Sequence, residues 1–439
     1  MRISDNGRYL VDEDGKPFFY LADTAWRLFF ELSREEAEEY LLNRKEKGFT
    51  VIMCSLLMEA MKNSSEKFSN YYGNEPMENH DPSRLNVAFF EHVDYVINKA
   101  NELGLCVALL PAWGEFVGPL MWGEGPVIFN QNNAFTYGKY IGNRYGDKNI
   151  IWVLGGDRNP ENDEYLNVWR AMARGLNAGD DNRCLMTYHP CPDYQGRRVS
   201  SGDWVHNEPW LDFNMMQTST RWDFDNYSFI MKDYNRAPVK PVLDGETRYE
   251  NSHEFFYKRP PTGRRITAHQ VRKAAYNALL SGAMGHTYGS RDIFCYYVPT
   301  DIKPLRDVSV FWKNAMNFPG AFHMGNMKKL FLDYPWFKLN PVQDKKLVVY
   351  GCEDGAIYTP AAISADKDFA LVYIPEKQQI YVDMNMMAGT SVSTLWFNPR
   401  NGTYSSAESF GHYDSFTGFI PPEEDTDSDY VLVLKSDIV

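Results

Sequence analysis

Short apolar runs alternate with longer amphipathic stretches over roughly the first 320 residues, and this alternation restricts the fold more than any other feature of the chain. Amphipathic stretches that predict helices lie at residues 33–47, 86–103, 133–145 and 267–281. Strand-like runs lie at residues 18–21, 50–55, 105–110, 150–154, 185–188, 214–217, 239–243 and near His286. Eight strands that alternate with helices predict an α/β fold, a (β/α)8 TIM barrel.

Local signals agree with this interpretation. Ser33 is followed three residues later by Glu36, a capping box that predicts a helix start. Gly48 and Gly104 follow the last apolar positions of the first two helices and predict their ends. No glycine-rich phosphate-binding sequence follows the first strand, which disfavours a doubly wound nucleotide-binding sheet.

The pattern changes after Pro319 and Gly320, where short β-rich runs are separated by turn residues. The predicted strands are residues 346–350, 357–359, 369–374, 380–382, 391–397 and 430–434. We therefore expect a barrel domain over residues 1–325, followed by a small antiparallel β-sandwich domain over residues 326–439.

The chain carries 58 acidic and 45 basic residues, a formal net charge of −13. This surplus disfavours nucleic acid and an anionic membrane as partners. No apolar run reaches the roughly 18 residues that span a bilayer, and the first residues lack the apolar core of a signal peptide. We expect a cytoplasmic protein, or a periplasmic or secreted one if a leader was removed. The six cysteines lack metal-ligand spacing, so we expect reduced thiols and no metal site.

Two carboxylates stand where a barrel places its active site, just after the C-terminal ends of strands. Asp157 follows the fourth predicted strand and two glycines, and Glu246 follows the seventh. Either alone would ordinarily be a salt-bridged loop residue. Together, a carboxyl pair across a barrel mouth is what retaining glycoside hydrolysis requires, with the two groups about 5–5.5 Å apart.

Three segments resemble the apiosidase-like barrels of glycoside hydrolase family 140: the opening residues 9–26, Leu154-Gly-Gly-Asp-Arg-Asn159, and Asp244-Gly-Glu246. The resemblance covers nearly the whole chain and implies a TIM barrel followed by a β-sandwich. It also implies a retaining hydrolase, with Asp157 as acid/base and Glu246 as nucleophile. The family's characterised activity is that of an endo-apiosidase, which cuts apiose-linked side chains from the pectin rhamnogalacturonan II. In the wider clan the acid/base is usually a glutamate after asparagine, whereas here Asp157 follows a glycine.

Other polar and aromatic residues near predicted strand ends are candidates for substrate binding. Trp26 and Trp113 offer flat faces to a sugar ring, although core packing explains each equally well. The remaining candidates could hydrogen bond to hydroxyl groups or to the nucleophile, and these are Asp23, Glu115, His189, Gln217, Tyr288 and, further along, Arg291.

Three arginines could form a local basic pocket for an acidic pectin fragment: Arg158, Arg221 and Arg248. The alternative is that they neutralise nearby aspartates. Because a general acid needs a raised pKa, we expect Arg158 to point away from Asp157.

The leading hypothesis is a retaining glycosidase that needs no metal or organic cofactor and takes a plant cell-wall oligosaccharide as its partner. One alternative keeps the mechanism but changes the glycan. Another is a non-catalytic carbohydrate-binding protein. The oligomeric state and the choice between endo and exo action stay open.

Overall fold

The computed structural model spans residues 1–439 and describes all of them except 59–67, 119–125, 196, 219–223, 257, 259, 302–306, 390, 414–415, 423–427 and 437–439. For residues 193, 356 and 410–413 it describes the backbone alone. In the part described, no helix combines the length and apolar character needed to cross a membrane.

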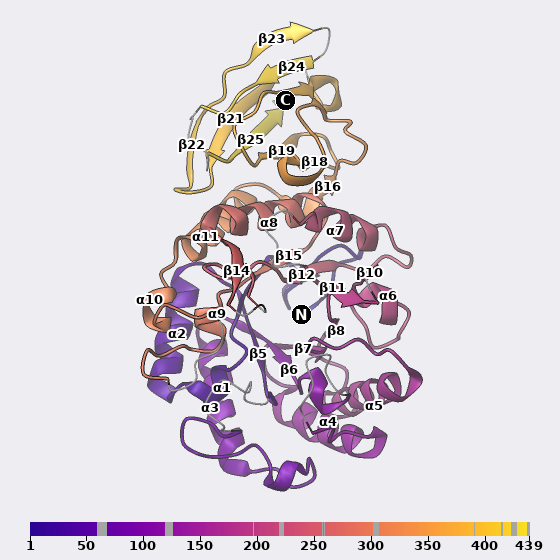
Figure 1. The fold of residues 1–439 in the computed structure, drawn as a ribbon. Helices are drawn as coiled ribbons and strands as arrows, with labels where there is room; N and C mark the ends of the chain where they lie inside the picture. The colour runs from indigo at the N-terminus through magenta and orange to yellow at the C-terminus, as the bar shows by residue number, and fades with distance from the viewer. Residues whose placement is uncertain are drawn as a thin grey trace.

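The first domain is a parallel eight-stranded barrel (Figure 1). Neighbouring strands are hydrogen bonded in the order β11-β12-β15-β4-β5-β6-β7-β8, and β8 and β11 lie side by side to close the barrel. The strands are β4 (Tyr20–Thr24), β5 (Val51–Ser55), β6 (Cys106–Leu110), β7 (Ile150–Gly155), β8 (Met186–His189), β11 (Asn214–Gln217), β12 (Val242–Glu246) and β15 (Gly285–Tyr288). The predicted TIM barrel is confirmed.

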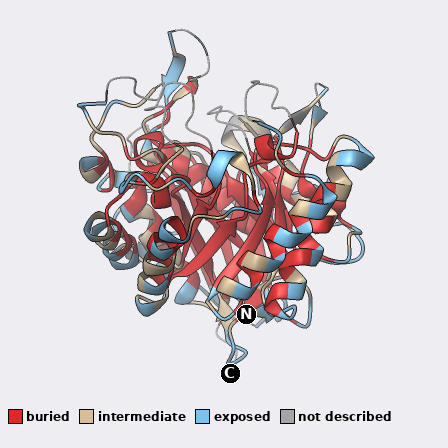
Figure 2. Cartoon of the chain, turned by 90° about the horizontal axis from the view of Figure 1, so that it is seen from below, coloured by how far each residue is buried: buried red, intermediate tan, exposed pale blue. Residues whose placement is uncertain are grey.

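Helices surround the barrel and cover the outer faces of the strands (Figures 1 and 2). The long ones are α2 (Arg34–Glu46), α3 (Val87–Glu102), α4 (Gln131–Tyr145), α5 (Asp163–Asp180), α7 (Asn226–Tyr234), α8 (Ala268–Leu280) and α11 (Pro319–Leu332). The predicted capping box starts α2, where the Ser33 backbone N–H donates to Glu36 Oε2 at 3.2 Å and the Glu36 N–H donates to Ser33 Oγ at 3.2 Å.

The hydrophobic core fills the barrel and the layer between strands and helices. Every residue of β4, β5, β6 and β7 is buried, and so is every residue of β12 and β15 (Figure 2). Continuous apolar strands of this kind suit a parallel sheet that is covered on both faces. The core gives the strand ends a rigid frame on which to hold functional side chains.

The second domain consists of two antiparallel sheets. One has the strand order β16-β18-β19-β25-β21-β22 and the other β17-β20-β24-β23. Their bounds are β16 (Leu339–Pro341), β17 (Val348–Tyr350), β18 (Ala361–Ser364), β19 (Phe369–Ile374), β20 (Ile380–Asp383), β21 (Val392–Asn398), β22 (Thr403–Ser406), β23 (Phe410–Tyr413), β24 (Phe416–Phe419) and β25 (Tyr430–Ser436).

One predicted strand of this domain was wrong. Residues 355–357 form a short 3-10 helix, and the strand comes later, at Ala361–Ser364. Helix α11 also runs through residues 325 and 326, so the chain reaches the first strand of the β-domain only at Leu339.

The β-domain packs against α8 and α11 of the barrel (Figure 1). Arg272 of α8 donates two hydrogen bonds to Asp429, at 2.8 and 2.7 Å, and both side chains are buried. Beside them Tyr276 stacks on Tyr373 with ring centroids 4.6 Å apart. The buried ion pair and the stacked aromatic rings together hold the two domains in contact.

Candidate active site

Asp157, His189 and Glu246 meet at the C-terminal mouth of the barrel. Asp157 follows β7, His189 ends β8 and Glu246 ends β12. One ligand-type atom of each residue lies within 4.8 Å of those of the other two, so the two carboxylates approach each other across the mouth. Glu246 and His189 are buried, whereas Asp157 is partly exposed.

Two glycines create the turn that presents Asp157. Gly155 and Gly156 have φ values of +86° and +110°, which side chains rarely adopt. A Cβ on Gly155 would lie 2.3 Å from the His189 carbonyl oxygen, and one on Gly156 would lie 2.8 Å from the Trp113 ring. Asp157 itself has a φ of +49°, a left-handed conformation that aspartate tolerates better than most residues. The turn thus brings the Asp157 backbone against the neighbouring strand.

An irregularity in β12 aims Glu246 into the barrel mouth. The register between β11 and β12 shifts at Gln217, where Gly245 is the extra residue. Asp244, before the shift, accepts hydrogen bonds from Thr218 Oγ1 at 3.0 Å and Asn226 Nδ2 at 2.9 Å, on the side of α7. Glu246, after the shift, faces His189 across the barrel. Only the second of these two carboxylates therefore joins the site.

Two side chains hold the Glu246 carboxylate in place. His189 Nε2 lies 2.7 Å from Oε2, and the Tyr249 hydroxyl donates to Oε1 at 2.5 Å. The Trp26 indole N–H in turn donates to the Tyr249 oxygen at 3.2 Å. Burial and the nearby Glu246 charge raise the pKa of Tyr249 well above its usual value, so its hydroxyl stays protonated and donating.

The hydrogen-bonding role of His189 follows from its other partner. The Asp157 backbone N–H can only donate, and it points at His189 Nδ1 over 3.4 Å. A neutral His189 therefore carries its proton on Nε2 and donates it to Glu246. Burial lowers the pKa of His189, but the hydrogen bond to Glu246 and the charges of Glu246 and Asp157 outweigh it and raise the pKa overall.

Asp157 has the environment of a general acid. Burial and the adjacent Glu246 charge raise its pKa to about 7, against the smaller opposing effects of His189, a hydrogen bond from Gln217 and the Arg291 charge. Its Oδ1 is buried without a hydrogen-bond partner. An aspartic acid that keeps its proton near neutral pH can donate it to a leaving group.

The predicted tryptophans form one wall of the site. The Trp26 and Trp113 rings meet edge to face with centroids 4.9 Å apart, and both lie within 5.7 Å of the His189 ring. They are only 2% and 3% exposed, so they act mainly by packing around His189. Glu115 lies next to this wall in a short 3-10 helix, Gly114–Phe116, and is 8% exposed.

Asp23 and Tyr288 were predicted to bind substrate, but the structure places both on the helix side of the barrel. They are register partners on β4 and β15, and both are 0% exposed. The Asp23 carboxylate accepts from Tyr40 at 2.6 Å and from Arg44 at 3.1 Å, while the Tyr288 hydroxyl donates to Glu250 at 2.6 Å. These contacts are structural because neither side chain offers any surface to a ligand.

Of the three arginines predicted to form a basic pocket, the two that the structure describes, Arg158 and Arg248, do not point toward the carboxylate pair. Arg158 lies 3.5 Å from Glu161 and over the Tyr165 ring, away from Asp157 as expected. Arg248 is 1% exposed and donates to the Phe224 carbonyl at 2.6 Å. Arg221 lies outside the described residues.

Tyr249 is the important residue that the sequence analysis missed. It follows Glu246 by three positions. A tyrosine so close in sequence to a predicted nucleophile could have been recognised as a candidate hydrogen-bond donor to it. Arg291, one of the predicted candidates, lies in the short helix α9 (Arg291–Phe294) and is 5% exposed. Its positive charge acts to lower the pKa of Asp157.

Asp157, His189 and Glu246 are the only group of histidine, cysteine and acidic side chains among the described residues that could hold a metal ion. Two carboxylates and one imidazole are ligands that several divalent metals accept. A metal would have to replace the direct contact between His189 and Glu246, so it would compete with the hydrogen bonds that now position the carboxylate.

The site combines a carboxylic acid of raised pKa with a second carboxylate that accepts hydrogen bonds from a histidine and a tyrosine. At the mouth of a parallel barrel, these features define the class of hydrolases that act on glycosidic bonds. The sequence matches the family model "Apiosidase-like, catalytic domain" over residues 4–338, and the chain belongs to this family of glycoside hydrolases. Residues 342–435 match a second model, "Putative collagen-binding domain of a collagenase".

Solved structures agree with this assignment. One described as a glycoside hydrolase is 29% identical, with a TM-score of 0.85 over 99% of this chain and 96% of its own. Another, described as a glycoside hydrolase family 5 protein from Bacteroides vulgatus, is 28% identical, with a TM-score of 0.85 over 99% and 93% of the two chains. The search among curated proteins gave no match.

Proposed function

We propose that this protein is a retaining glycoside hydrolase in which Glu246 is the nucleophile and Asp157 the acid/base. The observation that carries the proposal is the approach of the two carboxylates to within 4.8 Å between oxygens. Retaining enzymes hold their carboxyl groups about 5–5.5 Å apart, whereas inverting enzymes need roughly 6.5–9.5 Å to admit a water molecule.

The environments of the two groups support different roles. In the first step, Glu246 Oε attacks the anomeric carbon while the Asp157 proton moves to the departing glycosidic oxygen, so one C–O bond forms as the other breaks. In the second step, ionised Asp157 takes a proton from water, whose oxygen displaces Glu246. The hydrogen bonds from Tyr249 and His189 orient the Glu246 carboxylate for both steps.

For the substrate, we propose apiose-linked side chains of pectin, those of rhamnogalacturonan II. The choice of this substrate rests on the resemblance to the apiosidase-like family and on the match to that family over residues 4–338. Other plant glycans remain the alternative, because loop shape decides substrate choice.

The test is to incubate the protein with rhamnogalacturonan II side-chain oligosaccharides and with a panel of other plant oligosaccharides, and to analyse the products. We expect release of apiose-linked fragments, persistence of turnover in EDTA, and no release by Asp157→Ala. Cleavage of a different glycan would overturn the substrate, and binding without any product would favour a carbohydrate-binding protein.

A further inference from the structure

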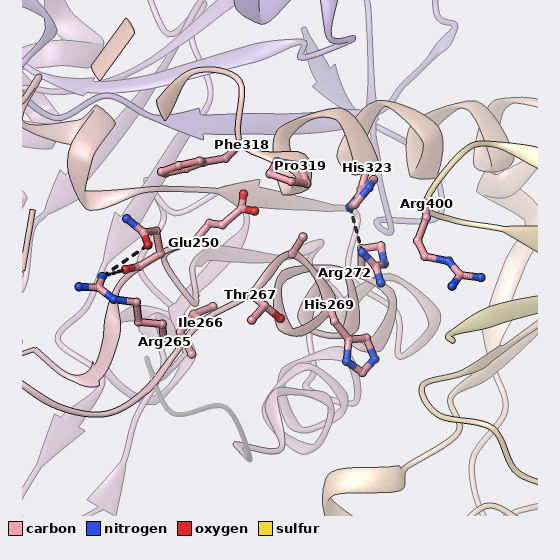
Figure 3. A pocket seen from close by; sticks show the side chains of 12 residues that line it. Glu250, Arg265, Ile266, Thr267, His269, Arg272, Phe318, Pro319, His323 and Arg400 are labelled. Carbon is pink, nitrogen blue, oxygen red and sulfur yellow. Dashed lines mark hydrogen bonds between the residues drawn. The ribbon is translucent and has the colours of Figure 1, made fainter. Parts of the chain in front are cut away.

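Buried polar groups outside the hydrolytic residues serve different parts of the molecule. One group lies at the domain contact, where a cavity of about 530 Å³ opens between α8, α11 and the β-domain (Figure 3). There Arg272 donates to His323 Nδ1 at 2.9 Å and pairs with Asp429, so this group joins the two domains. Another group is centred on Asp244, in the same strand as Glu246 and two residues before it.

Asp244 is a buried carboxylate that accepts hydrogen bonds from neutral side chains. Thr218 Oγ1 donates to its Oδ1 at 3.0 Å, and Asn226 Nδ2 donates to its Oδ2 at 2.9 Å. The same Asn226 amide donates to the Ala274 carbonyl at 2.8 Å, which connects the first residue of α7 to α8. Asp244 is therefore fixed to the helix layer that surrounds the barrel.

Thr218 connects Asp244 to the irregularity that aims Glu246. Its side chain contacts Asp244, before the extra residue Gly245, and its hydroxyl oxygen also lies 2.9 Å from Thr247 Oγ1, after it. Its backbone N–H donates to the Glu246 carbonyl at 2.6 Å. Thr218 thus contacts the chain on both sides of Gly245. Because an extra residue interrupts the ladder of backbone hydrogen bonds, contacts of this kind are needed to hold one geometry at this point.

The residue before Thr218 contacts the other carboxylate of the pair. Gln217 ends β11, and its side chain is hydrogen bonded to Asp157. Because Gln217 and Thr218 are consecutive, a shift of the chain at Thr218 would move the hydrogen-bond partner of Asp157 as well as the backbone of Glu246. One short segment at the end of β11 therefore contacts both proposed catalytic residues.

We propose that the Thr218 hydroxyl, held by Asp244, is a positioning group that sets the separation and direction of Glu246 and Asp157. Thr218 is 2% exposed, so it acts through the two carboxylates and not by contact with a substrate. Catalytic groups must be held within about 0.5 Å of their productive geometry, and a misplacement of about 1 Å can cost roughly a hundredfold in rate. This role rests on those proposed above for Glu246 and Asp157 in glycoside hydrolysis.

The test compares Thr218→Val with Thr218→Ser and with Thr50→Val in the full chain. The valine removes the hydroxyl at nearly constant volume, whereas the serine keeps it. Thr50 is the matched control because it connects β4 to β5 at the opposite end of the barrel, where it donates to the Phe19 carbonyl at 2.7 Å and accepts from the Leu21 N–H at 2.9 Å. Thermal melting followed by circular dichroism checks folding. Thr218→Ala, which leaves room for water, replaces the valine variant if that variant does not fold.

Two readouts are measured, one of turnover and one of geometry. With the oligosaccharide that the wild type cleaves, we expect kcat to fall by about ten- to a hundredfold in Thr218→Val while KM stays nearly unchanged. Thr218→Ser should recover most of kcat, and Thr50→Val should lose stability but keep kcat. Crystal structures of the wild type and Thr218→Val need no substrate, and the Glu246 carboxylate should move by more than about 0.5 Å relative to His189.

A normal kcat in folded Thr218→Val, or an unmoved Glu246 carboxylate, overturns the positioning role. An equal loss of kcat in Thr50→Val also overturns it, because the loss would then follow stability. Each of these results leaves the proposed glycosidase activity in place. A wild type that cleaves no glycan would instead contradict the proposed function, and the crystallographic comparison alone would then decide the positioning role.

Discussion

Tyr249 donates a 2.5 Å hydrogen bond to Glu246, the carboxylate that His189 approaches from its other oxygen. The two donors come from different parts of the barrel, one from the loop after β12 and the other from the end of β8. Together they hold both oxygens of a buried carboxylate that lies beside Asp157. Two fixed hydrogen bonds of this kind would orient Glu246 for the nucleophilic role that we propose for it.

Loss of the Tyr249 hydroxyl should slow catalysis without unfolding the protein. In Tyr249→Phe we expect kcat to fall by roughly ten- to a hundredfold, because a hydrogen bond to a charged group contributes about 1.5–3 kcal/mol. Steady-state kinetics with circular dichroism measures both effects. Tyr288→Phe is the matched control, since its hydroxyl donates to buried Glu250 at 2.6 Å outside the site. It should lower stability and leave kcat unchanged, and equal kcat losses in the two variants would contradict the role of Tyr249.

The pH dependence of turnover should report the raised pKa of Asp157. A general acid is active when protonated, so with a pKa of about 7 the rate should decline as the pH rises through 7. A pH–rate profile of kcat/KM measures this alkaline limb. In Asp157→Asn, tested on a substrate with an activated leaving group, the limb should disappear. An unchanged limb in this variant would assign the titration to another residue.

The same raised pKa has a consequence for stability. Because folding raises the pKa of Asp157 above that of the unfolded chain, its contribution to stability is greatest at low pH and is lost as the pH rises through about 7. Asp157→Asn removes the buried charge, so we expect its melting temperature to exceed that of the wild type at pH 8 by more than at pH 5. Differential scanning calorimetry at the two pH values tests this, and a pH-independent difference would contradict it.

Asp23 should matter for stability and not for substrate affinity. Asp23→Ala leaves Arg44 buried without its carboxylate, a change that typically costs about 3–5 kcal/mol. Urea unfolding measures the loss, and Asp14→Ala, in an exposed pair with Lys16, should cost less than about 1 kcal/mol. A raised KM with normal stability in Asp23→Ala would contradict the structural role and indicate that Asp23 binds substrate.

The barrel could be predicted from sequence because its signal is redundant. Eight apolar runs separated by amphipathic helices specify the architecture even when individual ends are misjudged, as at β12, which was predicted at residues 239–243 and lies at Val242–Glu246. Asp157 could be located because Gly155 and Gly156 precede it directly after a strand.

The side of the barrel that each residue faces could not be predicted as well. Successive strand residues point to opposite faces, so an error of one position exchanges the interior for the helix layer. Asp23 and Tyr288 were misplaced for this reason. The shift at Gly245, which separates the direction of Asp244 from that of Glu246, has no signature in a single sequence beyond the glycine itself.

The directions of the arginine side chains could not be predicted, because charge pairing depends on residues distant in sequence. Arg248 binds the Phe224 carbonyl, and Arg272, which was not singled out, forms a buried pair with Asp429, 157 positions away. Sequence proximity to a catalytic carboxylate therefore says little about where an arginine side chain points.

The most direct measurement of the central claim is the rescue of Glu246→Ala by azide, using an activated aryl glycoside of the substrate sugar. If Glu246 is the nucleophile of a retaining enzyme, the variant should fold normally and lose turnover by several orders of magnitude. Azide should then restore turnover and yield a glycosyl azide of inverted anomeric configuration, because the small anion attacks from the vacated side. Near-normal activity of Glu246→Ala without azide would contradict the assignment of Glu246 and with it the proposed mechanism.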